Sequence, residues 1–431
     1  MKNLTVEIAG AALAIGVVLS SILGVGFKDR EGGRHSLKIA RAQSIEHPLQ
    51  TDEKPYNKRD SVDFLPVDNP QEMPLCTNAK AAYVSEAHSG IAVFEKNAKR
   101  HLPIASMCKI MTLLLTFEAI DSGVLSYDDE VMISENAASM GGSQVFLEEN
   151  AKYPVRELIK SIVVCSANDS CVALAERIAG NDSLFVERMN DRAKELGCED
   201  TLFANCTGLP KEPQYSCAKD VAKMLGELIK HDEYFTYGKI WMDKFQHPEN
   251  RFTEISNTNR LVKFYDGCDG GKTGFTNEAG FCLAATAMRN GMRIISVVIG
   301  EPSSKIRFKE VSDSFDYAFA NYTMKKVVSA EKNLDGIGVS GGKEKRVDVR
   351  PQRDGYIFLK RGEKEDCTVE IELGQSLKAP VSKGENAGTL IIYRSGVEYD
   401  RIPMVTAACV EKAGYLDALR DVAQDWNFCG Q

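Results

Sequence analysis

Three short motifs stand in a fixed order along this chain of 431 residues, and they constrain its fold more than any other feature. They are Ser106-Met107-Cys108-Lys109, which is S-x-x-K, Ser166-Ala167-Asn168, which is S-x-N, and Lys272-Thr273-Gly274, which is K-T-G. Each alone is weak evidence, because S-x-x-K and S-x-N recur elsewhere in the chain. In this order and on suitable elements, the three motifs together predict one serine-based site.

The sequence around the motifs predicts elements that would hold them. The run from Met107 to Ile120 is apolar on every side and predicts a buried helix, which places Lys109 one turn from Ser106 on the same face. The S-x-N motif falls between two further predicted helices, and K-T-G begins an apolar strand. These helices are predicted over Pro154–Val164 and Ser170–Ile178, and strands over Lys80–Glu86, Ile91–Glu95, Lys272–Thr276, Phe281–Met288 and Met292–Gly300, with a tight Asn290-Gly291 turn.

The first two motifs hold the residues that an activated serine needs. A serine hydroxyl is a poor nucleophile at neutral pH and requires a base within hydrogen-bond reach. Lys109 can be that base for Ser106 if its pKa falls, and burial beside a second cation, here Lys272, lowers a lysine pKa. We expect Ser166 to pass a proton from Lys109 to a departing amine, and Asn168 to hold both Lys109 and a substrate amide.

The third motif offers groups that bind a substrate. Lys272 and Thr273 present a cation and a hydroxyl to a carboxylate, while Gly274 lets a substrate backbone approach the strand. An oxyanion hole needs two backbone N–H groups, and the amides of Ser106 and Phe275 are the natural candidates. The motif therefore predicts binding sites for a carboxylate and for an oxyanion.

Charge and cysteine spacing argue against other classes of site. The formal net charge is −8, from 53 Lys and Arg against 61 Asp and Glu, so nothing favours a nucleic acid as partner. Twelve cysteines and six histidines are present, but no C-x-x-C, H-x-x-x-H or H-E-x-x-H spacing gives a metal site. We expect most of the cysteines to be small buried hydrophobic side chains.

The N-terminal 27 residues are predicted to be a signal peptide or a membrane anchor. Ile8–Phe27 is a run of 20 residues without charge, long enough to cross a bilayer as one helix. The positive charges that follow this run would favour the opposite orientation, but the chemistry of the motifs favours export. Residues 28–75 hold prolines among polar residues with no apolar period, and predict a linker.

The C-terminal quarter has a different sequence pattern, which predicts a separate β-sandwich module over residues 323–408. Short segments typical of strands are separated by turns rich in Gly, Pro and Lys. The strands are predicted at Arg346–Arg350, Tyr356–Lys360, Thr368–Leu373 and Thr389–Tyr393. Residues 409–431 are predicted to be an amphipathic tail helix. Its acidic residues outnumber its basic ones, so we expect an anionic membrane surface to repel it.

At these motifs the chain resembles the low-molecular-mass penicillin-binding proteins of the serine D-alanyl-D-alanine carboxypeptidase type. Pro103–Thr112, Asn205–Pro210 and Asp266–Thr276 are similar to blocks of that family, and the likeness covers roughly residues 76–408. It implies an α+β fold in which residues 76–322 form a serine β-lactamase/transpeptidase-like catalytic domain, an antiparallel sheet flanked by helices. A small all-β module follows.

The resemblance also implies a function and the roles of four residues. Ser106 would be the acyl-forming nucleophile, Lys109 the proton acceptor, Ser166 the proton shuttle and Lys272 the group that binds a terminal carboxylate. The substrates would be peptidoglycan peptides ending in D-Ala-D-Ala, with β-lactams as inhibitors. No metal or organic cofactor is implied. The enzyme would act on the cell wall and cell shape from the outer face of the cytoplasmic membrane, secreted or held by its N-terminal segment.

Two other functions remain as alternatives. A serine β-lactamase shares these motifs but must deacylate fast, usually through a glutamate that activates water, and the stretch from Glu199 to Asn205 has the wrong spacing for that. A non-catalytic wall-binding protein would use the β module for contacts, and the intact motifs argue against it. We expect Asp169, directly after the S-x-N motif, to cap the next helix rather than to act as a catalytic acid.

Overall fold

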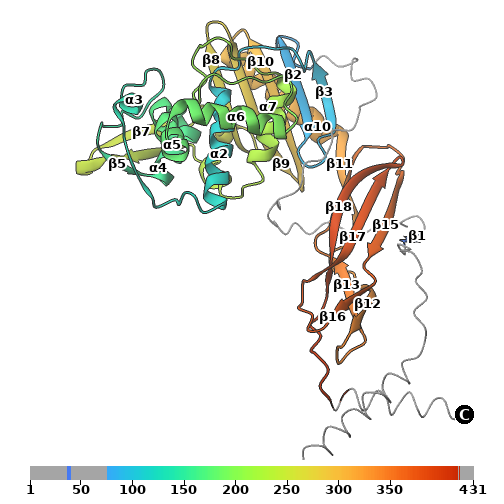
Figure 1. Cartoon of the computed structure of the whole chain (residues 1–431). Helices are drawn as coiled ribbons and strands as arrows, with labels where there is room; N and C mark the ends of the chain where they lie inside the picture. The colour runs from blue at the N-terminus through green and yellow to red at the C-terminus, as the bar shows by residue number, and fades with distance from the viewer. Residues whose placement is uncertain (1–35, 40–74, 416, 418–431) are drawn as a thin grey trace, which may run out of the picture.

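A five-stranded antiparallel sheet organises the part of the chain that holds the three motifs (Figure 1). The structure, a computed structural model, describes residues 36–39, 75–415 and 417. The strand order is β3-β2-β10-β9-β8, so K-T-G lies on an edge strand. The five strands are β2 (Ala81–Glu86), β3 (Ala92–Lys96), β8 (Cys268–Thr276), β9 (Gly280–Arg289) and β10 (Met292–Glu301). Asn290 and Gly291 have φ of 50° and 74° in the turn before β10, which confirms the predicted tight turn.

The two faces of this sheet pack against different partners, because alternate side chains of a strand point to opposite sides. On β10, Ile295, Val297 and Ile299 join a core with the helices that follow the S-x-x-K and S-x-N motifs. Ile294 and Val298 face the other way, into a core shared with α10 and the C-terminal module. The helices are η1 (Ala105–Cys108), α2 (Lys109–Asp121), α3 (Glu135–Ala138), α4 (Val155–Cys165), α5 (Asn168–Ala179), α6 (Asp182–Glu195), α7 (Ala218–Leu228), α8 (Tyr234–Gly238), η2 (Pro248–Asn250), α9 (Leu261–Phe264) and α10 (Ser304–Asn321).

Two short antiparallel strand pairs and an all-β C-terminal module complete the described fold. The pairs are β4 (Glu130–Met132) with β5 (Lys152–Pro154), and β6 (Met242–Gln246) with β7 (Phe252–Ser256). The module has a seven-stranded sheet, ordered β1-β15-β17-β18-β13-β12-β16, and a two-stranded sheet β11-β14. Its strands after α10 are β11 (Tyr322–Val328), β12 (Leu334–Ser340), β13 (Arg346–Pro351), β14 (Gly355–Lys360), β15 (Cys367–Leu373), β16 (Ser376–Lys378), β17 (Asn386–Arg394) and β18 (Val397–Thr406). The predicted α+β class with a separate all-β module is confirmed.

The structure differs from the sequence prediction at both ends of the chain. Within the predicted linker, β1 (Ser36–Ile39) pairs antiparallel with β15, whose outer edge would otherwise present unpaired backbone groups. The predicted tail helix does not begin at 409, because Val410 bridges Val381 and Lys412 bridges Gly342 along the module.

The predicted membrane segment Ile8–Phe27 and most of the tail lie outside the described residues. Among the residues that the structure does describe, no helix has both the length and the apolar character to cross a membrane.

Two buried carboxyl groups join the last residue of β10 to α10. Glu301 is 1% exposed and Glu310 is 5% exposed, and neither carboxyl oxygen of Glu301 has a hydrogen-bond partner among the described residues. Glu310 Oε1 also accepts hydrogen bonds from the backbone and side-chain amides of Asn78 at 2.9 and 2.6 Å. Burial, and then the contact with Glu310, raise the pKa of Glu301 to about 9. The Glu301 carboxyl group is therefore protonated at neutral pH.

We expect Glu301→Gln to remove a pH dependence of stability. The folded wild type holds one proton more than the unfolded chain between the ordinary glutamate pKa and about 9, so the free energy of unfolding falls as pH rises through this window. A glutamine amide keeps the donor without titrating. Urea unfolding at pH 5 and pH 8.5 should therefore show that the free energy of unfolding of the variant rises relative to that of the wild type as pH rises. Parallel pH curves for the two proteins would contradict a protonated Glu301.

Candidate active site

Ser106 and Lys109 meet at the junction of η1 and α2. Ala105 adopts a left-handed φ of 47°, and the short η1 turn then leads directly into α2. The Lys109 Nζ donates to Ser106 Oγ at 2.9 Å and to the Thr207 carbonyl at 2.5 Å. Lys109 is 0% exposed, and this burial lowers its pKa. A buried amine on a serine hydroxyl is the arrangement of a nucleophile with its base.

Ser166 and Lys272 form a second pair of hydroxyl and amine. Ser166 ends α4 with a left-handed φ of 68°, and its Oγ accepts a hydrogen bond from Lys272 Nζ at 2.9 Å. Lys272 Nζ also donates to the Thr273 carbonyl at 3.0 Å. Burial, and then repulsion from Lys109, hold the pKa of Lys272 well below its usual range. The two amines thus lie close enough to disfavour charge on both at once.

Asn168 lies beside the pair but does not hold Lys109 as expected. Its Nδ2 donates to the Gly141 carbonyl at 2.7 Å, and its backbone N–H donates to the Ser143 carbonyl at 2.7 Å. Its buried Oδ1 has no hydrogen-bond partner within the described chain. The expected contact with Lys109 is not formed, and Asn168 is instead held by the loop at Gly141 and Ser143.

Asp169 anchors the same loop and also accepts an amide of the first turn of α5. It is 0% exposed, and its carboxylate accepts hydrogen bonds from the amides of Val145 at 3.0 Å and Leu147 at 3.2 Å. The N-cap residue of α5 is Ala167, which has no side chain to cap the helix, and Asp169 Oδ1 accepts the Ser170 amide of its first turn at 2.9 Å. Asp169 thus holds in place the loop whose carbonyl groups bind Asn168.

The K-T-G strand passes directly against the serine turn. A Cβ at Gly274 would lie 2.5 Å from the Ile104 carbonyl oxygen and 3.3 Å from the Ser106 amide nitrogen. Only glycine permits this approach. Thr273 is buried, while the Phe275 side chain is 52% exposed and packs on Phe281 with ring centroids 4.4 Å apart. The three motifs therefore converge on one place.

Arg307 on α10 lies behind the K-T-G strand and was not predicted from the sequence. It is 6% exposed, and its Nη1 donates to the Cys282 carbonyl at 3.1 Å and the Gly274 carbonyl at 3.4 Å. Its Nε has no partner among the described residues. Burial lowers the pKa of Arg307 to about 10, which still leaves it charged at neutral pH. This adds a positive charge next to Gly274 that no local motif signals.

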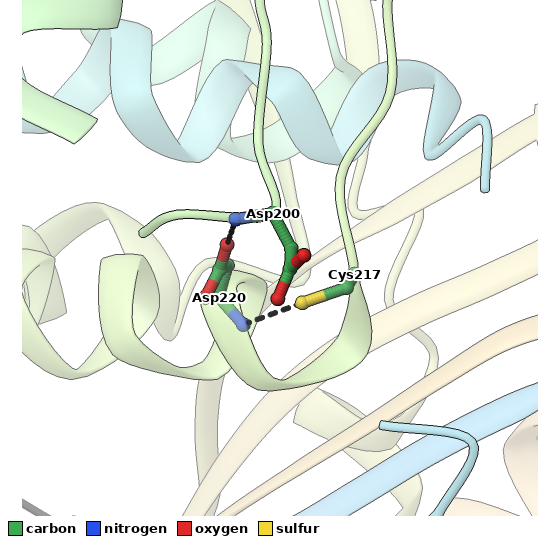
Figure 2. A group of neighbouring side chains, drawn as sticks. All are labelled: Asp200, Cys217 and Asp220. Carbon is green, nitrogen blue, oxygen red and sulfur yellow. Dashed lines mark hydrogen bonds between the residues drawn. The ribbon is translucent and has the colours of Figure 1, made fainter. Parts of the chain in front are cut away.

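Three residues on α7 and the loop before it have donor atoms close enough to hold a metal ion, namely Asp200, Cys217 and Asp220 (Figure 2). Cys217 caps α7 by accepting the Asp220 amide at 3.4 Å, and Asp220 Oδ2 accepts the Asp200 amide at 2.9 Å. Asp200 Oδ1 pairs with His101 at 2.8 Å. These contacts make the group a helix cap, and we assign no metal to it.

Cysteines surround the site as buried thiols. Eight of the eleven cysteines in the described chain are buried, and all eleven are free. Cys108, inside the S-x-x-K motif, is 0% exposed and donates to the Asn205 carbonyl at 3.2 Å. Their packing agrees with the expectation that most serve as small hydrophobic side chains.

Comparison with known proteins gives two family matches. Residues 68–303 match the family described as D-alanyl-D-alanine carboxypeptidase, and residues 322–412 match the C-terminal domain of penicillin-binding protein 5. The chain is 38% identical over 364 residues to D-alanyl-D-alanine carboxypeptidase DacF of Bacillus subtilis (strain 168), covering 84% of this chain and 94% of that protein.

Solved structures agree with these matches. Penicillin-binding protein 5 of Haemophilus influenzae is 29% identical with a TM-score of 0.61, over 80% of this chain and 100% of that one. Penicillin-binding protein D2 of Listeria monocytogenes, in its ampicillin-bound form, is 31% identical with a TM-score of 0.52, over 57% of this chain and 99% of that one.

Proposed function

The chain belongs to the D-alanyl-D-alanine carboxypeptidase family, and from this premise we propose that it cleaves its substrate through an acyl-enzyme on Ser106. It is a serine-type carboxypeptidase of peptidoglycan peptides that end in D-Ala-D-Ala, it binds β-lactams, and it acts outside the cytoplasm. One observation carries the assignment of residues: two buried lysines each donate to a serine hydroxyl at 2.9 Å.

In the proposed acylation step, neutral Lys109 takes the proton of Ser106 Oγ as this oxygen attacks the carbonyl carbon of the penultimate D-alanine. The new C–O bond forms and the carbonyl oxygen becomes an oxyanion, for which the amides of Ser106 and Phe275 are the proposed donors. Ser166 then gives its proton to the leaving nitrogen and regains one from Lys109, so the C–N bond breaks and D-alanine departs. Water hydrolyses the ester and restores Ser106.

The terminal carboxylate of the substrate is proposed to bind at the K-T-G strand. Lys272 and Thr273 would contact it, and the buried guanidinium of Arg307 behind Gly274 supports an anion here. A bound carboxylate raises the pKa of Lys272 and keeps it charged, which in turn favours the neutral form of Lys109. Asn168 Oδ1 would accept a substrate amide N–H. We place these residues in a catalytic domain of residues 76–322, followed by the module of residues 323–408.

The proposal is tested with purified protein, a diacyl D-Ala-D-Ala peptide and a penicillin. We expect release of D-alanine and a penicillin adduct of long lifetime. Rapid turnover of the penicillin would instead mean a β-lactamase, and neither adduct nor D-alanine would mean a non-catalytic wall-binding protein. The family membership and the appended module favour the first outcome.

We further propose that Ile8–Phe27 directs export as a signal peptide and, where it stays uncleaved, anchors the enzyme at the membrane, from which it shapes the cell wall. The length and lack of charge of this run support the proposal. Cell fractionation should find the full chain with the membrane, also after deletion of residues 411–431. A variant in which a cleavable signal peptide replaces residues 1–27 should be released from the membrane. Release by the C-terminal deletion, with the N-terminal run cleaved away, would refute the anchor.

A further inference from the structure

The amine of Lys109 has a second partner besides Ser106, and this contact fixes the direction of its lone pair. Lys109 Nζ donates to the Thr207 carbonyl at 2.5 Å and lies 2.9 Å from Ser106 Oγ. A neutral amine that uses one N–H on a carbonyl has fewer orientations left for its lone pair, which must face the serine hydroxyl to take its proton. The position of the Thr207 carbonyl therefore bears on acylation.

Asn205 holds that carbonyl through a closed turn. Its Oδ1 accepts hydrogen bonds from the amide of Gly208 at 2.7 Å and from the amide and hydroxyl of Thr207, both at 3.1 Å. Its Nδ2 donates to the Leu209 carbonyl at 2.8 Å. One side chain thus bonds to three successive residues, and such local side-chain bonds define turns where the backbone has no regular ladder.

The turn is also pressed against the residue before Ser106. Gly208 has a φ of +81°, and a Cβ there would lie 2.0 Å from the Ala105 carbonyl oxygen. The Cys206 carbonyl accepts the Thr112 hydroxyl of α2 at 2.6 Å. The turn therefore contacts the chain on both sides of the pair formed by Ser106 and Lys109, and it cannot tilt without disturbing that pair.

We propose that Asn205 is a positioning residue for acylation, which fixes the Thr207 carbonyl so that the Lys109 lone pair faces Ser106. The inference rests on the proposed function, since it assumes Lys109 to be the base. Asn205 itself touches neither Ser106 nor the amine in the described chain. It acts through the backbone of the turn.

We expect Asn205→Ala to lower the second-order rate of penicillin acylation by about 100-fold, the cost of a small misplacement in an active site. The looser carbonyl also stabilises the charged amine less, so the acid limb of the pH–rate profile should move to lower pH. Asn205→Asp keeps the acceptor for Thr207 and Gly208, loses the donor to the Leu209 carbonyl and adds a negative charge. It should recover part of the plateau rate while its acid limb moves to higher pH. The other titratable groups near Lys109 are unchanged in both variants; they are Cys108, Cys171, Cys206, Asp169 and Lys272.

Asn190→Ala is the matched control. Asn190 Oδ1 accepts the Phe203 amide at 2.8 Å, so it holds the same segment at a point that is not in contact with Lys109. This variant should lose similar thermal stability but keep the wild-type acylation profile. Equal losses in both alanine variants, with unmoved acid limbs, would overturn the proposal.

The outcomes also separate this inference from the proposed function. A wild type without any penicillin adduct would refute the function, whereas a folded Asn205→Ala that acylates at the wild-type rate would refute only the role of Asn205. Should Asn205→Ala fail to fold, the aspartate variant decides. An acid limb moved to higher pH supports the role, and an unmoved limb overturns it.

Discussion

Ser106→Ala is expected to abolish covalent penicillin binding and to lower D-alanine release by a factor on the order of 10⁶, as losses of a nucleophile do in other serine hydrolases. No neighbouring hydroxyl can replace it, because Lys109 Nζ is directed at Ser106 Oγ and at a backbone carbonyl. The Ser166 hydroxyl is engaged by a different amine. Intact-mass spectrometry after incubation with a penicillin measures the adduct directly.

The same variant should remain folded. Ser106 makes no side-chain capping bond to η1, and its hydroxyl accepts only from Lys109 among the hydrogen bonds of the described chain. A matched control comes from a second S-x-x-K sequence, Ser329 to Lys332, which lies at the β11–β12 connection. Ser329→Ala should form the adduct as the wild type does. An adduct on Ser106→Ala would remove Ser106 from its role.

Much of this site could be predicted from the sequence because its motifs are local. Lys109 follows Ser106 by three residues, so helical spacing alone brings amine and hydroxyl to one face. The strands after K-T-G were recognisable from continuous apolar runs and the Asn290-Gly291 turn, which depend only on neighbours in the chain. Both predictions are confirmed because helical spacing and tight turns depend on residues that are close in the sequence.

The parts that sequence reasoning missed depend on contacts between distant segments. The Thr207 carbonyl accepts a hydrogen bond from Lys109, which is 98 residues away in the sequence. Every residue has a backbone carbonyl, so the sequence pattern does not show which of them binds Lys109. The sequence signal that was present is the glycine at 208, whose close approach to Ala105 needs the absence of a side chain. Arg307 reads as one more charge on an amphipathic helix, and only the packing of α10 under Gly274 gives it a place in the site.

Side-chain direction was the other source of error. Asn168 and Asp169 are adjacent; Asn168 was expected to hold Lys109 and a substrate amide, and Asp169 to cap the next helix. Both also turn toward the loop at 141–147, where backbone groups without a regular ladder need partners. The pairing of Ser36–Ile39 with β15 has the same cause, because the unpaired N–H and C=O groups of an edge strand form hydrogen bonds with another extended segment.

Lys109→Arg is expected to lower the rate of acylation by about 10³-fold although it keeps the positive charge, since general-base catalysis contributes an effect of this size. The base must give up its proton before it can take one from Ser106. Burial lowers the pKa of Lys109 and so populates the neutral amine, whereas a guanidinium stays protonated at any pH that the fold survives. Penicillin acylation followed by stopped flow measures the rate, and Lys343→Arg, in the exposed S-x-x-K sequence Ser340 to Lys343, should leave it unchanged.

A guanidinium is larger than an ammonium, and Lys109 is 0% exposed, so Lys109→Met serves as the second variant. The methionine side chain is similar in length to that of lysine and carries no charge to desolvate. Because the folded wild type binds fewer protons than the unfolded chain between the lowered pKa of Lys109 and 10.5, its free energy of unfolding rises with pH through that window. The methionine variant lacks this contribution, so it should exceed the wild type in stability most at low pH while failing to acylate. Near-normal acylation by either variant would mean that Ser106 is activated by another group, for which Lys272, held on Ser166 at 2.9 Å, would be the next candidate.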